Sequence, residues 1–263
     1  MRLSLRNTLL LLAVTLAASA RGAEIAMDAA TADSVAHIIS TRVQPSAGEP
    51  HGKILGRVSA AFLGTRYRAS TLIGGPRTPE VLVADFRGVD CFTYVDYVEA
   101  LSRSRDRESF LQNLARIRYV NGRIAYLNRR HFFSDWFATA PRNGVDITPQ
   151  LSPRYLTVRK QLNLRPDGGE YVQGLGIRPR NINYIPGRAV DAALAEKIRE
   201  GDYVGIYSPQ TGLDVSHVGI AVRHDGELWF RDASSMAAER KVVDSPFLAY
   251  VRQKPGIVVI RTE

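Results

Sequence analysis

The polar and apolar positions follow different periods in the two halves of the chain. In the N-terminal half, apolar residues recur at steps of three and four, which is typical of amphipathic helices. This spacing predicts helices over residues 36–43, 52–67 and about 107–117, and a short apolar run predicts a strand over residues 80–86.

Short alternating or apolar runs replace the helical period in the last third of the chain. They predict strands over residues 201–208, 216–223, 226–234 and 256–262. The sequence His-Asp-Gly between the second and third of these is typical of a hairpin turn. Helices followed by an antiparallel sheet indicate an α+β fold.

The middle of the chain is richer in Gly, Pro, Asn and aromatic residues. We expect inserted loops around short elements between about residues 119 and 185, with residues 165–181 as the most loop-like part. The chain has no internal repeat and no low-complexity linker. Residues 24–263 are therefore expected to form one domain.

The N-terminus has the pattern of a cleavable secretory signal peptide over residues 1–23. Two arginines precede an apolar run over residues 9–18, and small residues follow it. The run is too short to cross a bilayer comfortably, and no stop-transfer segment comes after it. Cleavage after Ala20 or Ala23 would give an exported protein, expected in the periplasm, with no stable membrane anchor.

The charge and the cysteine content restrict the expected binding partners and the possible roles of the cysteine. The formal net charge is +9, but basic residues are interspersed with acidic ones and no nucleic-acid motif is present, so no nucleic-acid partner is expected. An exported chain with a single cysteine cannot form an internal disulfide. Cys91 is therefore a core residue, an intermolecular partner or a nucleophile.

Cys91 lies where a helix is predicted to begin. Asp90 is a favoured N-cap type, and apolar residues then recur every three positions. A thiolate is stabilised by the free N–H groups of a first helical turn, and the same groups can hold an oxyanion. The repeating apolar positions are Phe92, Val95, Val98 and Leu101.

A nucleophilic thiolate needs a proton acceptor, which is usually a histidine. Of the five histidines, His37 and His51 have no partner pattern, and His224 belongs to the predicted turn. His131 lies among aromatic residues and could line a cleft or pack in the core. His217 begins an apolar strand that could hold its ring rigidly, so it is the best candidate for the base.

A third group should orient the imidazole. The predicted hairpin brings Asp232 beside the His217 end of the partner strand, although Asp232 could instead be a turn residue that ends the strand. Neither the single cysteine nor the scattered histidines have the spacing of a metal site, so no metal is expected.

Three segments carry a resemblance to a known family. The segments "DCFTYVDYVEAL", "GLDVSHVGIAV" and "RDASS" resemble the NlpC-type cell-wall cysteine hydrolases, and the match is closest to their N-acetylmuramoyl-L-alanine amidase-like branch. The resemblance covers about residues 55–235. It extends to the segments "FLGTRYRASTL", "NGRIAYLNRRHFFSDWF", "RPRNINYIP" and "GDYVGIYS".

The resemblance implies a papain-like fold with no metal or organic cofactor. Cys91 would be the nucleophile, His217 the base, and Asp232 the orienting group, at a position where many relatives have a histidine. The segment around Tyr67 would line the substrate cleft. So would His131 and Trp136, unless they pack in an aromatic core.

These observations predict an exported cysteine amidase that hydrolyses the bond between N-acetylmuramic acid and L-alanine in peptidoglycan or its fragments. One alternative is an endopeptidase that cuts between D-glutamate and a diamino acid of the stem peptide. A non-catalytic wall-binding module and an acyltransferase of the same superfamily remain open as well.

Overall fold

The computed structural model describes residues 24–263. The predicted signal peptide, residues 1–23, lies outside the described residues. The helices are α1 Ala29–Ile38, α2 His51–Ala60, α3 Cys91–Ser102, α4 Arg107–Arg118, α5 Asp135–Ala138, α6 Thr148–Leu151, α7 Ala192–Ala195 and α8 Phe247–Val251. The strands are β1 Ile25–Met27, β2 Leu82–Ala84, β3 Val145–Asp146, β4 Leu156–Leu162, β5 Arg178–Pro186, β6 Tyr203–Tyr207, β7 Val215–His224, β8 Glu227–Ala233, β9 Val242–Pro246 and β10 Gly256–Arg261.

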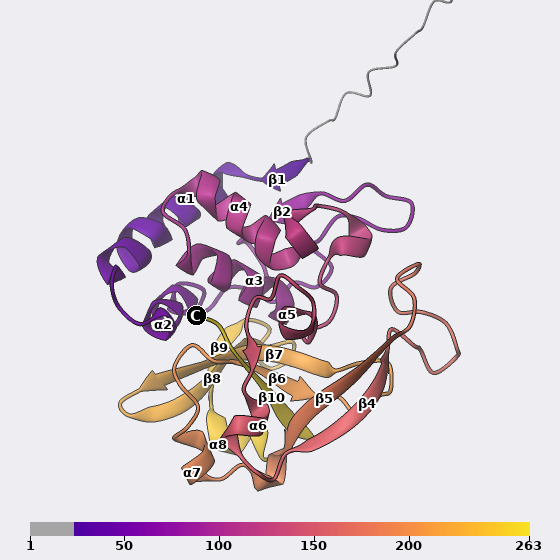
Figure 1. The fold of residues 1–263 in the computed structure, drawn as a ribbon. Coiled ribbons are helices and arrows are strands. Elements are labelled where there is room, and N and C mark those ends of the chain that lie inside the picture. Colours follow the sequence, from indigo (N-terminus) through magenta and orange to yellow (C-terminus); the bar gives the residue numbers. More distant parts are fainter. Residues whose placement is uncertain (1–23) are drawn as a thin grey trace, which may run out of the picture.

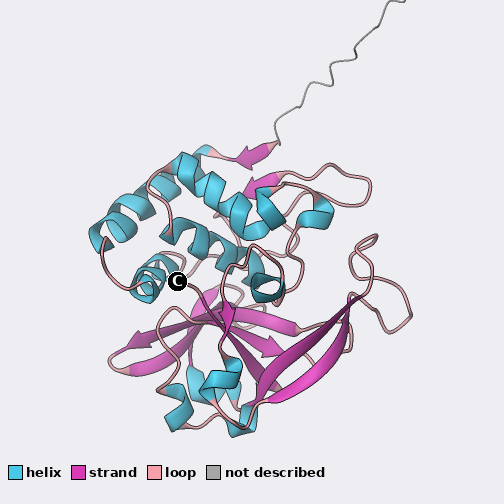
Figure 2. Cartoon of the chain, in the orientation of Figure 1, coloured by secondary structure: helices cyan, strands magenta, loops and turns pink. Residues whose placement is uncertain are grey.

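The elements form layers that follow the order of the chain. Helices α1 to α5 cover one face of an eight-stranded sheet, and the short helices α6 to α8 lie on its other side (Figure 1). The helices of the first half and the strands of the second half separate clearly (Figure 2). The predicted α+β fold is confirmed. No helix among residues 24–263 is long and apolar enough to cross a membrane.

The main sheet is antiparallel throughout. Its strand order is β4-β5-β10-β6-β7-β8-β9, and β3 pairs with β10. Strands β7 and β8 meet at a two-residue turn in which Asp225 and Gly226 both have positive φ, at 50° and 83°. Such a turn suits the twist of a hairpin, so the predicted hairpin turn is confirmed.

Alternating side chains of β7 contribute to two hydrophobic clusters. Val218, Ile220 and Val222 pack with α2, α3 and α4, whereas Ala221 packs with Phe230 on the face covered by α8. Because the sheet is covered on both sides, its central strands are apolar at consecutive positions.

Two predicted elements differ in length from those observed. The helix predicted over residues 52–67 ends at Ala60, and Gly64, with a φ of 81°, allows the chain to turn out of the helix. The chain then extends along Val89 through Tyr67. The inserted region also contains longer elements than expected, because β4 and β5 pair along seven positions. Many of their residues are polar, which hid the strand period.

Candidate active site

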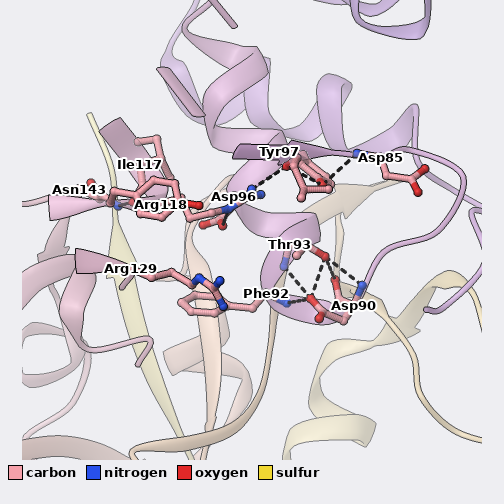
Figure 3. A network of polar contacts seen from close by, with 12 residues as sticks. Asp85, Asp90, Phe92, Thr93, Asp96, Tyr97, Ile117, Arg118, Arg129 and Asn143 are labelled. Carbon is pink, nitrogen blue, oxygen red and sulfur yellow. Dashed lines mark hydrogen bonds and ion pairs between the residues drawn. The ribbon is translucent and has the colours of Figure 1, made fainter. Parts of the chain in front are cut away.

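Helix α3 begins at Cys91 because its neighbours form a capping box. The Asp90 carboxylate accepts hydrogen bonds from the N–H groups of Phe92 at 3.1 Å and Thr93 at 2.7 Å, and the Thr93 hydroxyl accepts one from the Asp90 N–H at 3.0 Å (Figure 3). Such a cap satisfies donors that a helix start otherwise leaves free. The cap fixes the half-buried Cys91 as the first residue of the helix.

A buried ion pair holds α3 further along its length. Arg118 of α4 donates from Nε to Asp96 at 2.8 Å and from Nη1 to the Val83 carbonyl at 2.7 Å, as Figure 3 shows for the Asp96 contact. Burial raises the pKa of the Asp96 carboxyl, and the Arg118 charge opposes this effect. The pair therefore ties the helix that bears Cys91 to α4 and β2.

His217 and Asp232 meet across the hairpin. The His217 Nε2 lies 2.7 Å from Asp232 Oδ2, and the two side chains are 16% and 3% exposed. An ionised carboxylate can only accept, so Nε2–H is the donor and Nδ1 is left for another partner. The structure therefore forms the pairing that the hairpin predicted.

The environment of His217 favours its protonated form. Burial lowers the pKa of the ring, but hydrogen bonding to Asp232 and to the Cys91 side chain raises it, and the result is a pKa of about 10. At neutral pH the ring therefore carries a positive charge beside Cys91.

Gly219 leaves room for the ring that supports His217. A Cβ at Gly219 would lie 2.6 Å from two ring carbons of Phe230. The Phe230 ring in turn approaches the His217 ring edge-on, with 6.1 Å between centroids. A larger residue at Gly219 would collide with this ring and with the Arg231 carbonyl oxygen, which also lies 2.6 Å from the Cβ position.

A cavity of about 250 Å³ opens beside these groups. It brings together residues from α3, the segment before α5, the loop between β4 and β5, and the start of β7. The lining residues are Cys91, Phe92, His131, Phe132, Phe133, Tyr171, Val172, Leu213, Asp214, Val215, Ser216, His217 and Val218.

His131 lies in this cavity as a neutral ring. Its Nε2 is 2.8 Å from the Tyr126 carbonyl, so Nε2 carries the proton, because a carbonyl oxygen can only accept. Burial lowers the pKa of His131. The remaining Nδ1 is a hydrogen-bond acceptor, and His131 can therefore bind a donor of a substrate.

The other two predicted cleft residues have different environments. Tyr67 is half-buried on the segment that pairs with Val89; burial, and then the charge of Cys91, raise the pKa of its phenol. Tyr67 thus lies near Cys91. Trp136 is fully buried in the core, where its ring packs edge-on against Tyr203 at 4.9 Å.

Asp214 is a wall residue that the sequence reasoning did not identify. This buried carboxylate accepts hydrogen bonds from the N–H groups of Ser134 and Val215, both at 2.7 Å. Burial raises the pKa of Asp214. Its position in the loop before His217 was the only available signal, because its partner Ser134 is 80 residues away.

The described residues show no cluster of three or more His, Cys, Asp or Glu side chains that could hold a metal ion. Cys91 and His217 line the same cavity, and a thiol beside an imidazole can supply nucleophilic and acid–base chemistry.

Comparisons with known proteins show which solved structures this fold resembles. A crystal structure of a Legionella pneumophila protein, assigned to family DUF1460, has a TM-score of 0.73 and 25% identity, and the match covers 89% of this chain and 94% of that chain. An N-acetylmuramoyl-L-alanine amidase from Bacteroides uniformis has a TM-score of 0.68 and 30% identity, over 81% of this chain and 99% of that one. A search of curated proteins found no match.

A family model matches most of the chain. It covers residues 57–257 and describes an AmiA-like family, N-acetylmuramoyl-L-alanine amidase-like. This span includes Cys91, His217 and Asp232. The chain belongs to this N-acetylmuramoyl-L-alanine amidase-like family.

Proposed function

We propose that the protein is an exported cysteine amidase that cleaves the amide between N-acetylmuramic acid and L-alanine in peptidoglycan or its fragments. The proposal rests on one observation above all, the contact of His217 with both Asp232 and Cys91 at the wall of one cavity. Family membership supports the reaction class and a peptidoglycan-related substrate. The placement of Cys91 at a helix start against a sheet also supports a papain-like fold.

In the first step, the Cys91 thiolate attacks the lactyl carbonyl and forms a tetrahedral oxyanion. The N–H groups of Phe92 and Thr93 are held by Asp90, whereas the Cys91 N–H has no acceptor among residues 24–263. This N–H therefore stabilises the oxyanion. Tyr67 supplies a second donor, since its raised pKa keeps the phenol protonated near Cys91.

The intermediate then collapses to a thioester. His217, protonated at neutral pH, gives its proton to the departing amine of L-alanine, and the C–N bond breaks. A water molecule next attacks the thioester, with His217 as the base. The thiolate leaves, and the muramic acid carboxylate is released. Asp232 holds the ring in the required tautomer throughout.

Substrate binding and location form part of the same proposal. His131, with its free Nδ1, accepts a hydrogen bond from an N–H or O–H group of the substrate. Export to the periplasm rests on the signal pattern of residues 1–23. Removal of this segment, with its three arginines and no acidic residue, takes the net charge from +9 to +6, which still suits an anionic wall polymer. No metal or organic cofactor takes part.

Mass spectrometry of defined muropeptides tests the reaction directly. The wild-type protein should release peptides that begin with L-alanine, whereas Cys91→Ala should lower the rate by at least about 10⁴-fold, because no other group replaces the nucleophile. Circular dichroism would confirm that the variant folds. Iodoacetamide should alkylate Cys91 at pH 7 faster than free cysteine.

Other products would lead to other conclusions. Cleavage inside the stem peptide would keep the nucleophile but indicate the D-glutamyl-diamino acid endopeptidase. Product release that depends on an added amine would indicate an acyltransferase. Failure of the folded wild type to cleave any muropeptide would overturn the proposal in favour of a wall-binding module.

A further inference from the structure

A second cavity, of about 320 Å³, adjoins the catalytic one. Tyr171 lines both cavities, so the two cavities meet at this residue. The second cavity lies between two loops, residues 163–177 after β4 and residues 208–214 after β6. Figure 1 shows the first of these loops extending beyond the edge of the sheet. Besides Tyr171, the residues that line the second cavity are Leu164, Arg165, Pro166, Gln210, Thr211 and Gly212.

Buried hydrogen bonds from Asn163 fix the first loop in place. The Asn163 side chain donates to the carbonyls of Val172 at 3.0 Å and Gly176 at 3.1 Å, and it accepts from the Val172 N–H at 2.7 Å. The Asn163 N–H also donates to the Gly212 carbonyl at 2.9 Å. One residue therefore joins both walls, and the cavity is preformed.

Lys160 of β4 holds the second loop, residues 208–214, in place. Its ammonium group is buried and donates to the carbonyls of Ser208 at 2.7 Å and Gln210 at 2.8 Å. Within residues 24–263, no carboxylate forms an ion pair with it. Burial lowers the pKa of Lys160, and the charge of Asp214 opposes this effect.

One loop lines the second cavity and leads to His217. The loop that forms the wall at Gln210 and Thr211 continues through Asp214 directly to His217. His217 gives its proton to the departing amine in the proposed reaction. A peptide that extends from this amine along the same loop would pass Tyr171 and reach the second cavity.

Arg165 gives the cavity an available positive charge. Its Nη2 is 2.9 Å from Asp167 Oδ2, but the two side chains are 50% and 61% exposed. Such exposed pairs contribute little stability, so a ligand can replace Asp167 at low cost. The other acidic side chain of this loop, Glu170, accepts a hydrogen bond from the Gly174 N–H at 2.7 Å.

We propose that the second cavity is a subsite for the released peptide and that Arg165 binds a carboxylate of this peptide beyond its first residue. This inference rests on the proposed amidase function, because only that reaction places a peptide on the His217 side. Tyr171, whose hydroxyl lies 3.1 Å from Gln210 Oε1, positions the peptide between the two cavities.

The test compares two substrates that differ only in the charge of the second residue of the peptide. Muramyl-L-alanyl-D-glutamate, with its α- and γ-carboxylates free, is compared with the same compound in which both groups are carboxamides. Arg165→Gln should lower kcat/KM about tenfold for the carboxylate substrate, as expected for the loss of a hydrogen bond to a charged group, and leave the amide substrate unchanged. Asp167→Asn should raise kcat/KM for the carboxylate substrate about twofold.

Arg154→Gln is the matched control, since Arg154 forms a similar exposed pair with Asp191 far from the cavity. It should change neither substrate. An equal effect of Arg165→Gln on both substrates, or no effect on either, would overturn the subsite while leaving the amidase intact. A wild type that cleaves neither substrate would remove the proposed function, and the subsite inference with it.

Discussion

Two histidine–aspartate pairs lie near opposite ends of strand β7 and have almost the same geometry. His217 is 2.7 Å from Asp232, and His224 is 2.8 Å from Asp244. They differ in exposure, since the side chain of His217 is 16% exposed and that of His224 is 43% exposed. They also differ in neighbours: His217 contacts Cys91, whereas Asp244 also binds the buried Arg231.

The comparison shows that a histidine–aspartate contact does not by itself make a catalytic site. At His224 the carboxylate neutralises a buried guanidinium, and the ring lies at a turn. At His217, the carboxylate of Asp232 forms an ion pair with no cation among residues 24–263 other than the imidazolium. The Asp232 charge therefore raises the pKa of His217. The Cys91 thiol beside this histidine gives the protonated ring a reactive partner.

The largest expected difference between the pairs is in activity. His217→Ala should lower kcat/KM by about 10²–10⁴-fold, the usual contribution of a general acid–base group. His224→Ala should stay within about twofold, because this ring lies outside the catalytic cavity. Muropeptide hydrolysis by both folded variants measures the contrast, and similar losses in the two would contradict it.

Replacing the carboxylates should separate catalysis from stability. Asp232→Asn removes the charge that raises the His217 pKa, so the imidazolium is lost at a lower pH. We expect kcat/KM to fall about 10²-fold near neutral pH, as for other lost acid–base function, and its alkaline limb to move to lower pH. A pH–rate profile with unchanged limbs would argue against this role of Asp232.

Asp244→Asn is the corresponding substitution in the second histidine–aspartate pair, that of His224 and Asp244. It leaves the Arg231 guanidinium buried without its carboxylate, which should cost about 3–5 kcal/mol in the free energy of unfolding. The folded fraction should keep the wild-type pH profile. Urea denaturation together with the pH–rate profile distinguishes the two asparagine variants.

A smaller effect is expected at Gly219. Gly219→Ala would place a Cβ against the Phe230 ring and should lower the free energy of unfolding by about 1–3 kcal/mol. The variant should also shift the His217 ring, which packs on Phe230, and lower activity about tenfold. Gly75→Ala is the control, since its position has open space and no positive φ. Equal melting temperatures and rates for the two variants would refute this role of Phe230.

The last expected effect concerns the pH dependence of stability. The folded pKa of His217, about 10, exceeds the ordinary value of 6.5, so its stabilisation is complete below about pH 6.5 and is lost as the pH rises through 10. The melting temperatures of wild type and His217→Gln should therefore differ more at pH 6 than at pH 10.5. A difference independent of pH would contradict the raised pKa.

Local sequence patterns determined much of the site. Asp90 and the apolar repeat placed Cys91 at a helix start. The hairpin turn set the register of the two strands, which places Asp232 beside His217. These features depend on residues close together in the chain, because caps and tight turns are formed by local hydrogen bonds. The α+β order of helices and strands followed from the same local periods.

Only the tertiary structure decided which of these groups share a cavity. The contact of Asp214 with Ser134, the position of Tyr171 between two cavities, and the burial of Trp136 in the core depend on segments distant in the chain. The same holds for the histidine pKa, which is set by burial and by Cys91, 126 positions away in the sequence. A sequence specifies which groups are available, but their electrostatic environment comes from packing, and this packing distinguishes His217 from His224.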